Sequence, residues 1–401
     1  MRLLFWASAM TIGYVYVGYP LLLAVWAGIV GREGSACGPR EHSESAPAAK
    51  DDDRRSAVAS GGGAPRAVKK AGRDGPDDRL PGVSIVLAAR NEALRLAARI
   101  ENLLALDYPA DRRQIIVVSD GSTDRTLEAL AVFGGQIDIV AVPFGGKALA
   151  LNAGVARAAH PILVFTDARQ VFAADALRAL VAPFCDDTVG GVTGALMLDH
   201  ESAASTIAEG VSLYWNYETQ LRRLESTIGS TLGATGAIYA LRRSLWRDLP
   251  ADTLLDDVLA PMRAVLAGRR IVFEQRAKAY DRTPPDSQAE SRRKIRTLAG
   301  NVQILWLEPR LLIPFINPVW LQYYSHKLGR LAVPYALLAL LAASIALAGE
   351  GAFYAAALAG QCVFYLLAGY GAYLEWRDDH RVHATATESV PANLDKGVVN
   401  A

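Results

Sequence analysis

Four short apolar stretches between residues 83 and 166 each end in a polar turn, and a segment of helical character follows each of the first three. The stretches are rich in β-branched residues, which is typical of buried strands, and they cover residues 83–88, 114–118, 137–142 and 161–166. Strands that alternate with helices form parallel sheets with helices on both faces. We therefore predict an α/β fold for this part of the chain.

Polar side chains suited to a nucleotide follow these predicted strands. Asp120 follows the second strand, Lys147 follows a Gly-Gly pair after the third, and Asp167 follows the fourth. Asp120 could bind a base or ribose, the loop amides and Lys147 a diphosphate, and Asp167 a divalent cation. Each residue alone is explained more simply as a turn residue, a solvated helix start or a cap. Their succession on consecutive strand ends, where open α/β sheets bind ligands, favours a nucleotide site.

Four motifs in this region occur in the order typical of one enzyme family: VSIVLAARNE from residue 83, SDGSTD from 119, GKALALNAG from 146 and FTD from 165. Together they resemble family 2 inverting glycosyltransferases with the GT-A fold, in the membrane-bound subgroup of bacterial cellulose, chitin, hyaluronan and poly-N-acetylglucosamine synthases. The resemblance covers residues 80–310 and implies a mostly parallel GT-A domain that binds a nucleotide sugar, usually a UDP-sugar. The donor-binding residues that it implies are Ala89, Asn91, Glu92, Asp120, Lys147, Asp167, Arg169, Arg293 and Arg296.

The metal-binding motif of the family is altered in this sequence. The resemblance implies that Asp167 is the first acid of a DxD motif that binds Mg²⁺ or Mn²⁺, and Arg169 stands at the position of the second acid. An arginine cannot coordinate a cation, because its guanidinium has no acceptor. We expect Asp167 to bind the metal, and Arg169 to add positive charge for the departing diphosphate from the same face of the strand.

A second group of residues resembles the acceptor side of the family. The loop 229–236 consists almost entirely of small residues, which let a backbone approach a sugar closely. The pair Asp256 and Asp257 is similar to the family's Glu-Asp motif, whose second acid is the general base, and this implies catalysis by Asp257. Without the upstream motifs, two acids stabilised by a helix dipole would be the simpler interpretation. The acceptor-side residues that the resemblance implies are Gly233, Thr235, Gly236 and Asp256.

A basic segment, residues 291–297, precedes the apolar C-terminal part of the chain. Processive polysaccharide synthases of the family carry Gln-x-x-Arg-Trp at the comparable place. Here Arg293 replaces the Gln, Arg296 is retained and Thr297 replaces the Trp. The resemblance implies that Arg296 can still bind the diphosphate, whereas Thr297 cannot stack on the acceptor sugar as a Trp would. This difference favours transfer of one or a few sugars over long-chain synthesis. A basic flank of a membrane segment is the alternative interpretation, and both can hold.

Three long uncharged runs predict membrane segments. Basic residues flank the ends that we assign to the cytoplasm, so the protein is expected in the cell (inner) membrane as a multi-pass protein with a cytoplasmic catalytic domain. The formal net charge of +1 gives no case for a nucleic acid partner. The expected order is a transmembrane helix over 1–30, a disordered linker over 31–79, the GT-A domain over 80–310, an interfacial segment over 311–330, two transmembrane helices over 331–374 and a cytoplasmic tail over 375–401.

The predicted function is transfer of a sugar from a nucleotide sugar to a glycan or lipid-linked acceptor, in cell-envelope or extracellular polysaccharide synthesis. Membrane lipid and a partner subunit or second copy are expected partners, because three spans are few for an export channel. A polyprenyl-phosphate sugar transferase is one alternative. A noncatalytic glycosyltransferase-like subunit of a synthase complex is another, favoured by Arg169 and Thr297. A nucleotidyltransferase would need a glycine-rich loop after the first strand, and residues 89–92 do not form one.

Overall fold

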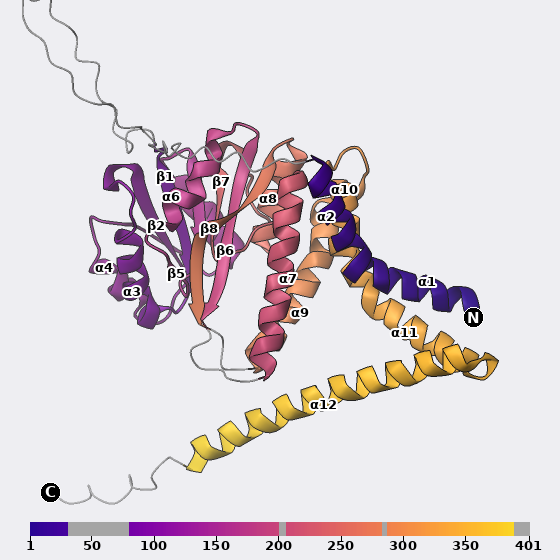
Figure 1. Cartoon of the computed structure of the whole chain (residues 1–401). Helices are drawn as coiled ribbons and strands as arrows, with labels where there is room; N and C mark the ends of the chain where they lie inside the picture. Colours follow the sequence, from indigo (N-terminus) through magenta and orange to yellow (C-terminus); the bar gives the residue numbers. More distant parts are fainter. Residues whose placement is uncertain (31–79, 200–205, 283–286, 389–401) are drawn as a thin grey trace, which may run out of the picture.

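The computed structural model describes residues 1–30, 80–199, 206–282 and 287–388, with a mixed eight-stranded sheet at its centre (Figure 1). The strand order is β3-β2-β1-β4-β7-β6-β8-β5. The strands are β1 (Val83–Ala89), β2 (Arg113–Asp120), β3 (Asp138–Val142), β4 (Ile162–Thr166), β5 (Val171–Phe172), β6 (Val189–Asp199), β7 (Tyr239–Arg242) and β8 (Arg270–Arg282). The helices of the same domain are α3 (Ala93–Leu104), α4 (Thr126–Ala131), α5 (Lys147–Arg157), α6 (Ala176–Val181), α7 (Thr206–Ile228), α8 (Asp256–Leu266) and α9 (Ser287–Leu307).

The four strands predicted first are β1 to β4, and they pair in parallel, β1 with both β2 and β4, and β2 with β3. The α/β prediction is therefore confirmed for this half of the sheet. In the other half, β7 runs antiparallel to β4 and β6, and β5 runs antiparallel to β8, so the complete sheet is mixed. The register pairs Ala89 with Ser119 and Leu87 with Thr166, which brings the carboxyl ends of β1, β2 and β4 to one edge.

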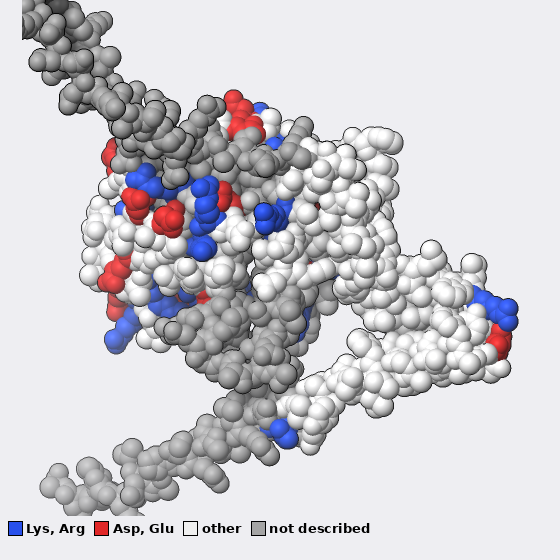
Figure 2. Space-filling view, viewed as in Figure 1, with Lys and Arg blue, Asp and Glu red and all other residues white. Residues whose placement is uncertain are grey.

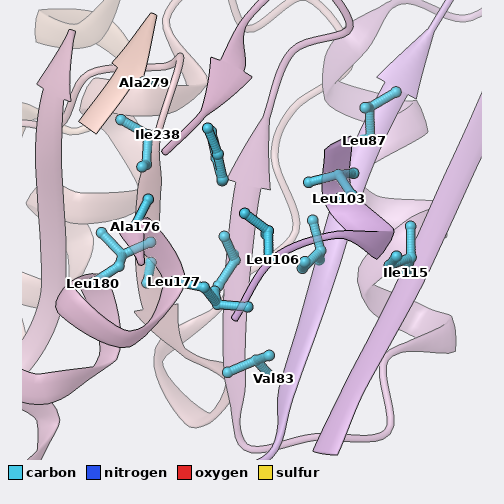
Figure 3. Packing of buried hydrophobic residues seen from close by; sticks show 14 of the residues in the cluster. Val83, Leu87, Leu103, Leu106, Ile115, Ala176, Leu177, Leu180, Ile238 and Ala279 are labelled. Carbon is cyan, nitrogen blue, oxygen red and sulfur yellow. The ribbon is translucent and has the colours of Figure 1, made fainter. Parts of the chain in front are cut away.

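Buried apolar side chains hold the sheet between two layers of helices. On one face, the strand residues Val83 and Leu87 pack with Leu103 at the end of α3 and with Leu177 and Leu180 of α6 (Figure 3). On the other face, the intervening residues of β1 and β2 pack against α5 and α8. Burial of each apolar side chain of this size stabilises the folded state by about 1.5–3 kcal/mol. The packing on both faces therefore fixes the strands, including the ends that carry the polar turns.

Gly154 allows α5 to lie very close to the sheet. A Cβ atom at this position would be 2.5 Å from Val86 Cγ1 and 3.0 Å from Val118 Cγ2, so any other residue would require a shift of the helix or of these valine side chains. This close packing fixes the first residue of α5, Lys147, at the edge where β1, β2 and β4 end.

Three helical stretches are long and apolar enough to cross a membrane: Arg2–Val30, Trp320–Glu350 and Ala352–Leu374. They are built from α1 (Arg2–Gly13), a π-helical turn (Tyr14–Gly18), α2 (Tyr19–Val30), α10 (Trp320–Gln322), a second π-helical segment (Tyr323–Leu328), α11 (Gly329–Leu347) and α12 (Ala352–Glu388).

α1 and α11 extend away from the sheet domain, and α12 turns back and runs below the domain in this view (Figure 1). α1 runs along α11, and α2 packs against α7 of the domain. Figure 2 shows that charged side chains gather on the sheet domain and are scarce over α11 and α12. The predicted linker over 31–79 lies outside the described residues, and the predicted tail over 375–401 is described as far as residue 388, where it continues α12.

Candidate active site

Lys147 lies between two carboxylates at the carboxyl edge of the sheet. Its Nζ atom is 3.0 Å from Asp167 Oδ1 and 3.2 Å from Asp256 Oδ1. α5 begins at Lys147, Asp167 directly follows β4, and α8 begins at Asp256, so three separate elements bring these charges together. Partial burial favours the neutral amine, but the two carboxylates outweigh it and raise the pKa of Lys147 above its ordinary value. The result is a stable cation at a helix N-terminus, which is a favourable place for a diphosphate.

Asp257 is the second residue of α8, and its carboxylate faces the small-residue loop. The Gly236 N–H donates a hydrogen bond to Asp257 Oδ2 at 3.0 Å. Burial and the neighbouring charge of Asp256 raise the pKa of Asp257 to about 6, while the charges of Lys147 and Lys327 act in the opposite direction. A carboxylate whose pKa lies close to neutrality is suited to accept a proton from a hydroxyl group.

The predicted acceptor-side residues lie around Asp257. Gly233 has a φ of 132°, which L-residues with a side chain rarely adopt. A Cβ atom would lie 3.3 Å from the Asp257 carbonyl oxygen at Gly233, and 3.0 Å from Asp257 Oδ2 at Gly236. The Thr235 hydroxyl accepts a hydrogen bond from Nη1 of Arg222 on α7. Gly236 therefore keeps a side chain away from the Asp257 carboxylate, Gly233 lets the loop pass close to the backbone of Asp257, and Arg222 holds Thr235 between them.

Asp120 is buried and uses both carboxylate oxygens to hold the Gly-Gly loop before α5. Oδ1 accepts the Gly145 N–H at 2.7 Å and Oδ2 accepts the Gly146 N–H at 3.0 Å. This arrangement gives Asp120 a structural role in positioning Lys147. Direct contact of Asp120 with a nucleoside stays a prediction.

The turns after β1 and β2 are joined by side chains. Asn91 has a φ of 56°, and its Oδ1 accepts the Thr123 N–H at 2.8 Å. The Glu92 N–H donates to Thr126 Oγ1 at 3.0 Å. Ala89, the last residue of β1, is buried below this pair of turns. Hydrogen bonds thus connect the predicted donor residues of the first motif to the turn that contains the second motif. Contact of these residues with the donor stays a prediction.

Arg169 is turned toward β8 in this structure. Its Nη2 atom is 2.6 Å from Asp281 Oδ2, and Nε2 of Gln170 donates to the same oxygen at 3.0 Å. The side chain of Asp281 is buried, so the ion pair joins the turn after β4 to β8. Sequence reasoning missed Asp281, because no motif links residues so distant in the chain. Participation of Arg169 in diphosphate binding stays a prediction, and its side chain is 42% exposed.

Arg99 of α3 is a second residue that the sequence did not indicate. It is buried, donates through Nη2 to Thr166 Oγ1 at 2.7 Å and lies over the ring of Phe172. Burial lowers the pKa of Arg99 to about 9, and the Asp167 carboxylate acts in the opposite direction. A buried cation is therefore held below the end of β4, close enough to Asp167 for the two charges to interact.

The predicted clamp residues Arg293 and Arg296 lie on α9. The C-terminal half of this helix packs on the segment before α8, where Gln303 Oε1 accepts the Leu254 N–H at 2.9 Å and Gly300 lies against Leu255. α9 is thus connected to the start of α8, and Arg296 is exposed on its surface. A contact of either arginine with the donor stays a prediction.

The described residues contain no group of three or more His, Cys, Asp or Glu side chains that could hold a metal ion by themselves. Asp167 offers hard carboxylate oxygens, one of them beside Lys147. The single protein carboxylate is compatible with a cation whose other ligands come from a bound diphosphate and water.

Comparison with known proteins identifies the domain. The model of the family described as Glycosyl transferase family 2 matches residues 84–249. The chain carries a family 2 glycosyltransferase domain. The matched region contains Asp120, Lys147 and Asp167, whereas Asp256 and Asp257 follow it. The family recognised from the four motifs is therefore confirmed.

Two curated relatives are poly-beta-1,6-N-acetyl-D-glucosamine synthases of staphylococci. The Staphylococcus aureus (strain COL) protein is 25% identical over 235 residues, and the Staphylococcus epidermidis protein is 25% identical over 234 residues. Each match covers 57% of this chain, and the chain spans 56% of the length of each relative.

A solved structure supports the fold. It is a mannosyltransferase from Pyrobaculum calidifontis in complex with GDP-Man and Mn²⁺, with a TM-score of 0.64 at 23% identity. The match covers 97% of this chain and 99% of that chain, so it includes the apolar helices as well as the sheet domain. The predicted GT-A fold with helical apolar segments is thereby confirmed.

Proposed function

We propose that this chain is a membrane-bound inverting glycosyltransferase that moves a sugar from a UDP-sugar to a hydroxyl group of a glycan or lipid-linked acceptor in cell-envelope or extracellular polysaccharide synthesis. The observation that carries the proposal is the convergence of Lys147, Asp167 and Asp256 beside a proton-accepting carboxylate, Asp257. The family 2 domain and its similarity to poly-beta-1,6-N-acetyl-D-glucosamine synthases support it.

In the proposed reaction, the acceptor oxygen bonds to the anomeric carbon of the donor while the bond from that carbon to the diphosphate breaks. The hydroxyl proton passes to Asp257, and the electron pair of the broken bond leaves with UDP. Attack on the face opposite UDP inverts the anomeric configuration. Lys147, at the N-terminus of α5, stabilises the negative charge that develops on the diphosphate.

We further propose that Asp167 would hold Mg²⁺ or Mn²⁺, which would supply positive charge for the donor diphosphate. The Asp167 side chain is 41% exposed at the end of β4, and hard divalent cations prefer such carboxylate oxygens. The similar mannosyltransferase was solved with Mn²⁺. When bound, the ion offsets part of the diphosphate charge. Lys147 contributes positive charge beside the same carboxylate.

The remaining predicted donor contacts belong to the same proposal: Ala89, Asn91 and Glu92 beside the nucleoside, and Arg169, Arg293 and Arg296 near the diphosphate. Asp120 supports the loop that presents Lys147. The absence of an aromatic residue at Thr297 favours transfer of one or a few sugars over long-chain synthesis.

We propose a multi-pass arrangement in the cell (inner) membrane with the family 2 domain in the cytoplasm, where nucleotide sugars are made. Three apolar helical stretches support membrane insertion. Lys327 and Arg330 lie at the domain end of α11, whereas the far end carries the ion pair of Arg2 with Glu350, at 2.7 Å. The positive-inside rule then orients the domain end toward the cytoplasm. Export of a product would require a partner subunit or a second copy.

The direct test is release of UDP from a panel of UDP-sugars, with GDP- and dTDP-sugars as comparisons, by the full chain in lipid with Mg²⁺ or Mn²⁺. Asp257→Asn is expected to lower turnover about 10²–10⁴-fold while donor binding persists. Asp187→Asn is the matched control, because the Asp187 side chain is 99% exposed and distant in the chain. Nucleotide binding without release from any donor and any acceptor would contradict the proposal and favour a noncatalytic subunit.

A further inference from the structure

Two cations near the proposed base form no ion pair with an acidic side chain in the described part of the chain. Lys327, in the π-helical segment before α11, makes no hydrogen bond or ion pair there, although Arg222 repels it and Asp257, Glu218 and Glu225 attract it at a distance. Arg222 of α7 donates to the neutral hydroxyl of Thr235, and no carboxylate within the described ranges forms an ion pair with it. Two positive charges therefore lie close together, and one of them, Arg222, contacts the small-residue loop 229–236.

Besides Asp257, two carboxylates act on Lys327, and both already have other partners. Glu218 forms an ion pair with Arg330. Glu225 is buried, accepts a hydrogen bond from the Tyr19 hydroxyl at 2.9 Å and lies 2.7 Å from Nδ1 of His326. Both acids act on Lys327 at a distance, but their side chains contact Arg330, Tyr19 and His326 and form no ion pair with Lys327 or Arg222. Positive charges that are partly withdrawn from water and have no direct ion-pair partner favour the binding of an anion.

The location of the pair indicates where the anion comes from. Lys327 lies at the start of Trp320–Glu350, one of the three stretches able to cross a membrane. Large apolar side chains are also exposed on α9 and in the segment after it, which precedes this stretch in the chain, with Trp306 83% exposed and Phe315 fully exposed. Such side chains are typical of a surface that contacts lipid. The two cations therefore lie where the sheet domain meets the membrane.

We propose that Lys327 and Arg222 bind the phosphate of a lipid-linked acceptor sugar, so that the acceptor hydroxyl lies beside Asp257 while the lipid tail remains in the membrane. This inference rests on the proposed function and names the acceptor class for the same site. A guanidinium and an ammonium suit phosphate oxygens, and Thr235 already places Arg222 on the loop that contacts Asp257. The phosphate takes no part in bond changes, and the proton of the hydroxyl still passes to Asp257.

Binding tests the inference independently of catalysis. The full chain in discs of zwitterionic lipid is titrated with farnesyl diphosphate and with farnesol, which share the same tail and differ in charge. We expect farnesyl diphosphate to bind at least about tenfold more tightly, and Lys327→Gln and Arg222→Gln each to weaken its binding about tenfold or more. Lys327→Arg should retain binding. Lys294→Gln is the control, because it removes an exposed cation of α9 and should change affinity less than about twofold.

Competitors distinguish other sources of phosphate. Inorganic phosphate and phosphatidylglycerol should displace farnesyl diphosphate only weakly. Displacement by phosphatidylglycerol at equal concentration would show a general lipid-headgroup site and overturn the assignment to an acceptor. Equal affinity for farnesol, or unchanged affinity in both Gln variants, would also overturn it.

Transfer assays separate this inference from the proposed function. A prenyl-diphosphate-linked monosaccharide should be used with a kcat/KM at least about tenfold above that of a neutral alkyl glycoside of the same sugar, and Lys327→Gln should reduce that preference. The assay is run at about pH 8, where loss of the Lys327 charge leaves Asp257 deprotonated. Equal use of both acceptors refutes the phosphate subsite and leaves the glycosyltransferase intact. If farnesyl diphosphate binds in a charge-dependent way but no donor is turned over, the proposed glycosyltransferase function is refuted and the phosphate subsite at Lys327 and Arg222 is retained.

Discussion

The pH dependence of turnover gives the sharpest test of the assignment of Asp257. The carboxylate must be deprotonated to accept the hydroxyl proton, and its pKa is raised to about 6 by burial and by Asp256. Activity should therefore be present above about pH 6 and lost as the pH falls through this value. At about pH 5 roughly one tenth of the molecules carry the charged base, and at about pH 7 roughly nine tenths do, which predicts a tenfold difference in kcat/KM.

An ordinary aspartate with a pKa of about 3.9 would be more than about nine-tenths charged at both pH values, and kcat/KM would hardly change. The profile thus distinguishes a perturbed base from an exposed acid of the same type. The donor contributes no ionisation in this range, because the diphosphate of a nucleotide sugar is esterified at both ends.

Asp256→Asn tests the cause of the shift. The substitution keeps the side-chain size and removes the negative charge that raises the Asp257 pKa, while Lys147 remains beside Asp167. The inflection should move to lower pH by about one unit. The assay is UDP release in lipid discs between about pH 5 and pH 8, with fluorescence at each pH to show that the fold persists. A flat wild-type profile, or an upward shift in the variant, would refute the assignment.

Three further predictions follow from the site and the core. Excess chelator should abolish UDP release by the full chain, with recovery on addition of Mn²⁺, and full turnover in chelator would exclude a required cation. Gly236→Ala should lower kcat/KM about 10- to 100-fold, because its Cβ would lie 3.0 Å from Asp257 Oδ2, whereas Gly229→Ala, with open space around it, should have little effect. Leu163→Ala in β4 should lower the free energy of unfolding by about 2–5 kcal/mol, measured by thermal unfolding in lipid, and Leu94→Ala at a fully exposed position should not.

The parallel half of the sheet was predictable because apolar strands and polar turns alternate regularly from β1 to β4. The same pattern placed Lys147 and Asp167 at one edge, where they form an ion pair. The strand ending at Arg242 and its antiparallel direction were not predicted, because strand composition does not encode which neighbour a strand pairs with.

Partners distant in the chain escaped prediction for a related reason. Arg169 and Asp281 are 112 residues apart, and only the pairing of β5 with β8 brings them together. Arg99 lies on the buried face of α3, where an apolar residue is the ordinary expectation. The π-helical segment Tyr323–Leu328 was not predicted either, because a change of helical hydrogen bonding does not alter the hydrophobic periodicity of the sequence in a recognisable way.

The electrostatics of Asp257 connect the two substrates of the proposed reaction. Lys147, on the donor side, and Lys327, at the start of the apolar helix, both lower the Asp257 pKa in the substrate-free protein. A diphosphate beside Lys147 and a phosphate beside Lys327 would each offset one of these positive charges. The pKa of Asp257 would then rise as each substrate binds, so the carboxylate would be a stronger base in the ternary complex than in the free protein. Because Lys327 belongs to the helix that leads into α11, the strength of the base also depends on how that helix is seated against the domain.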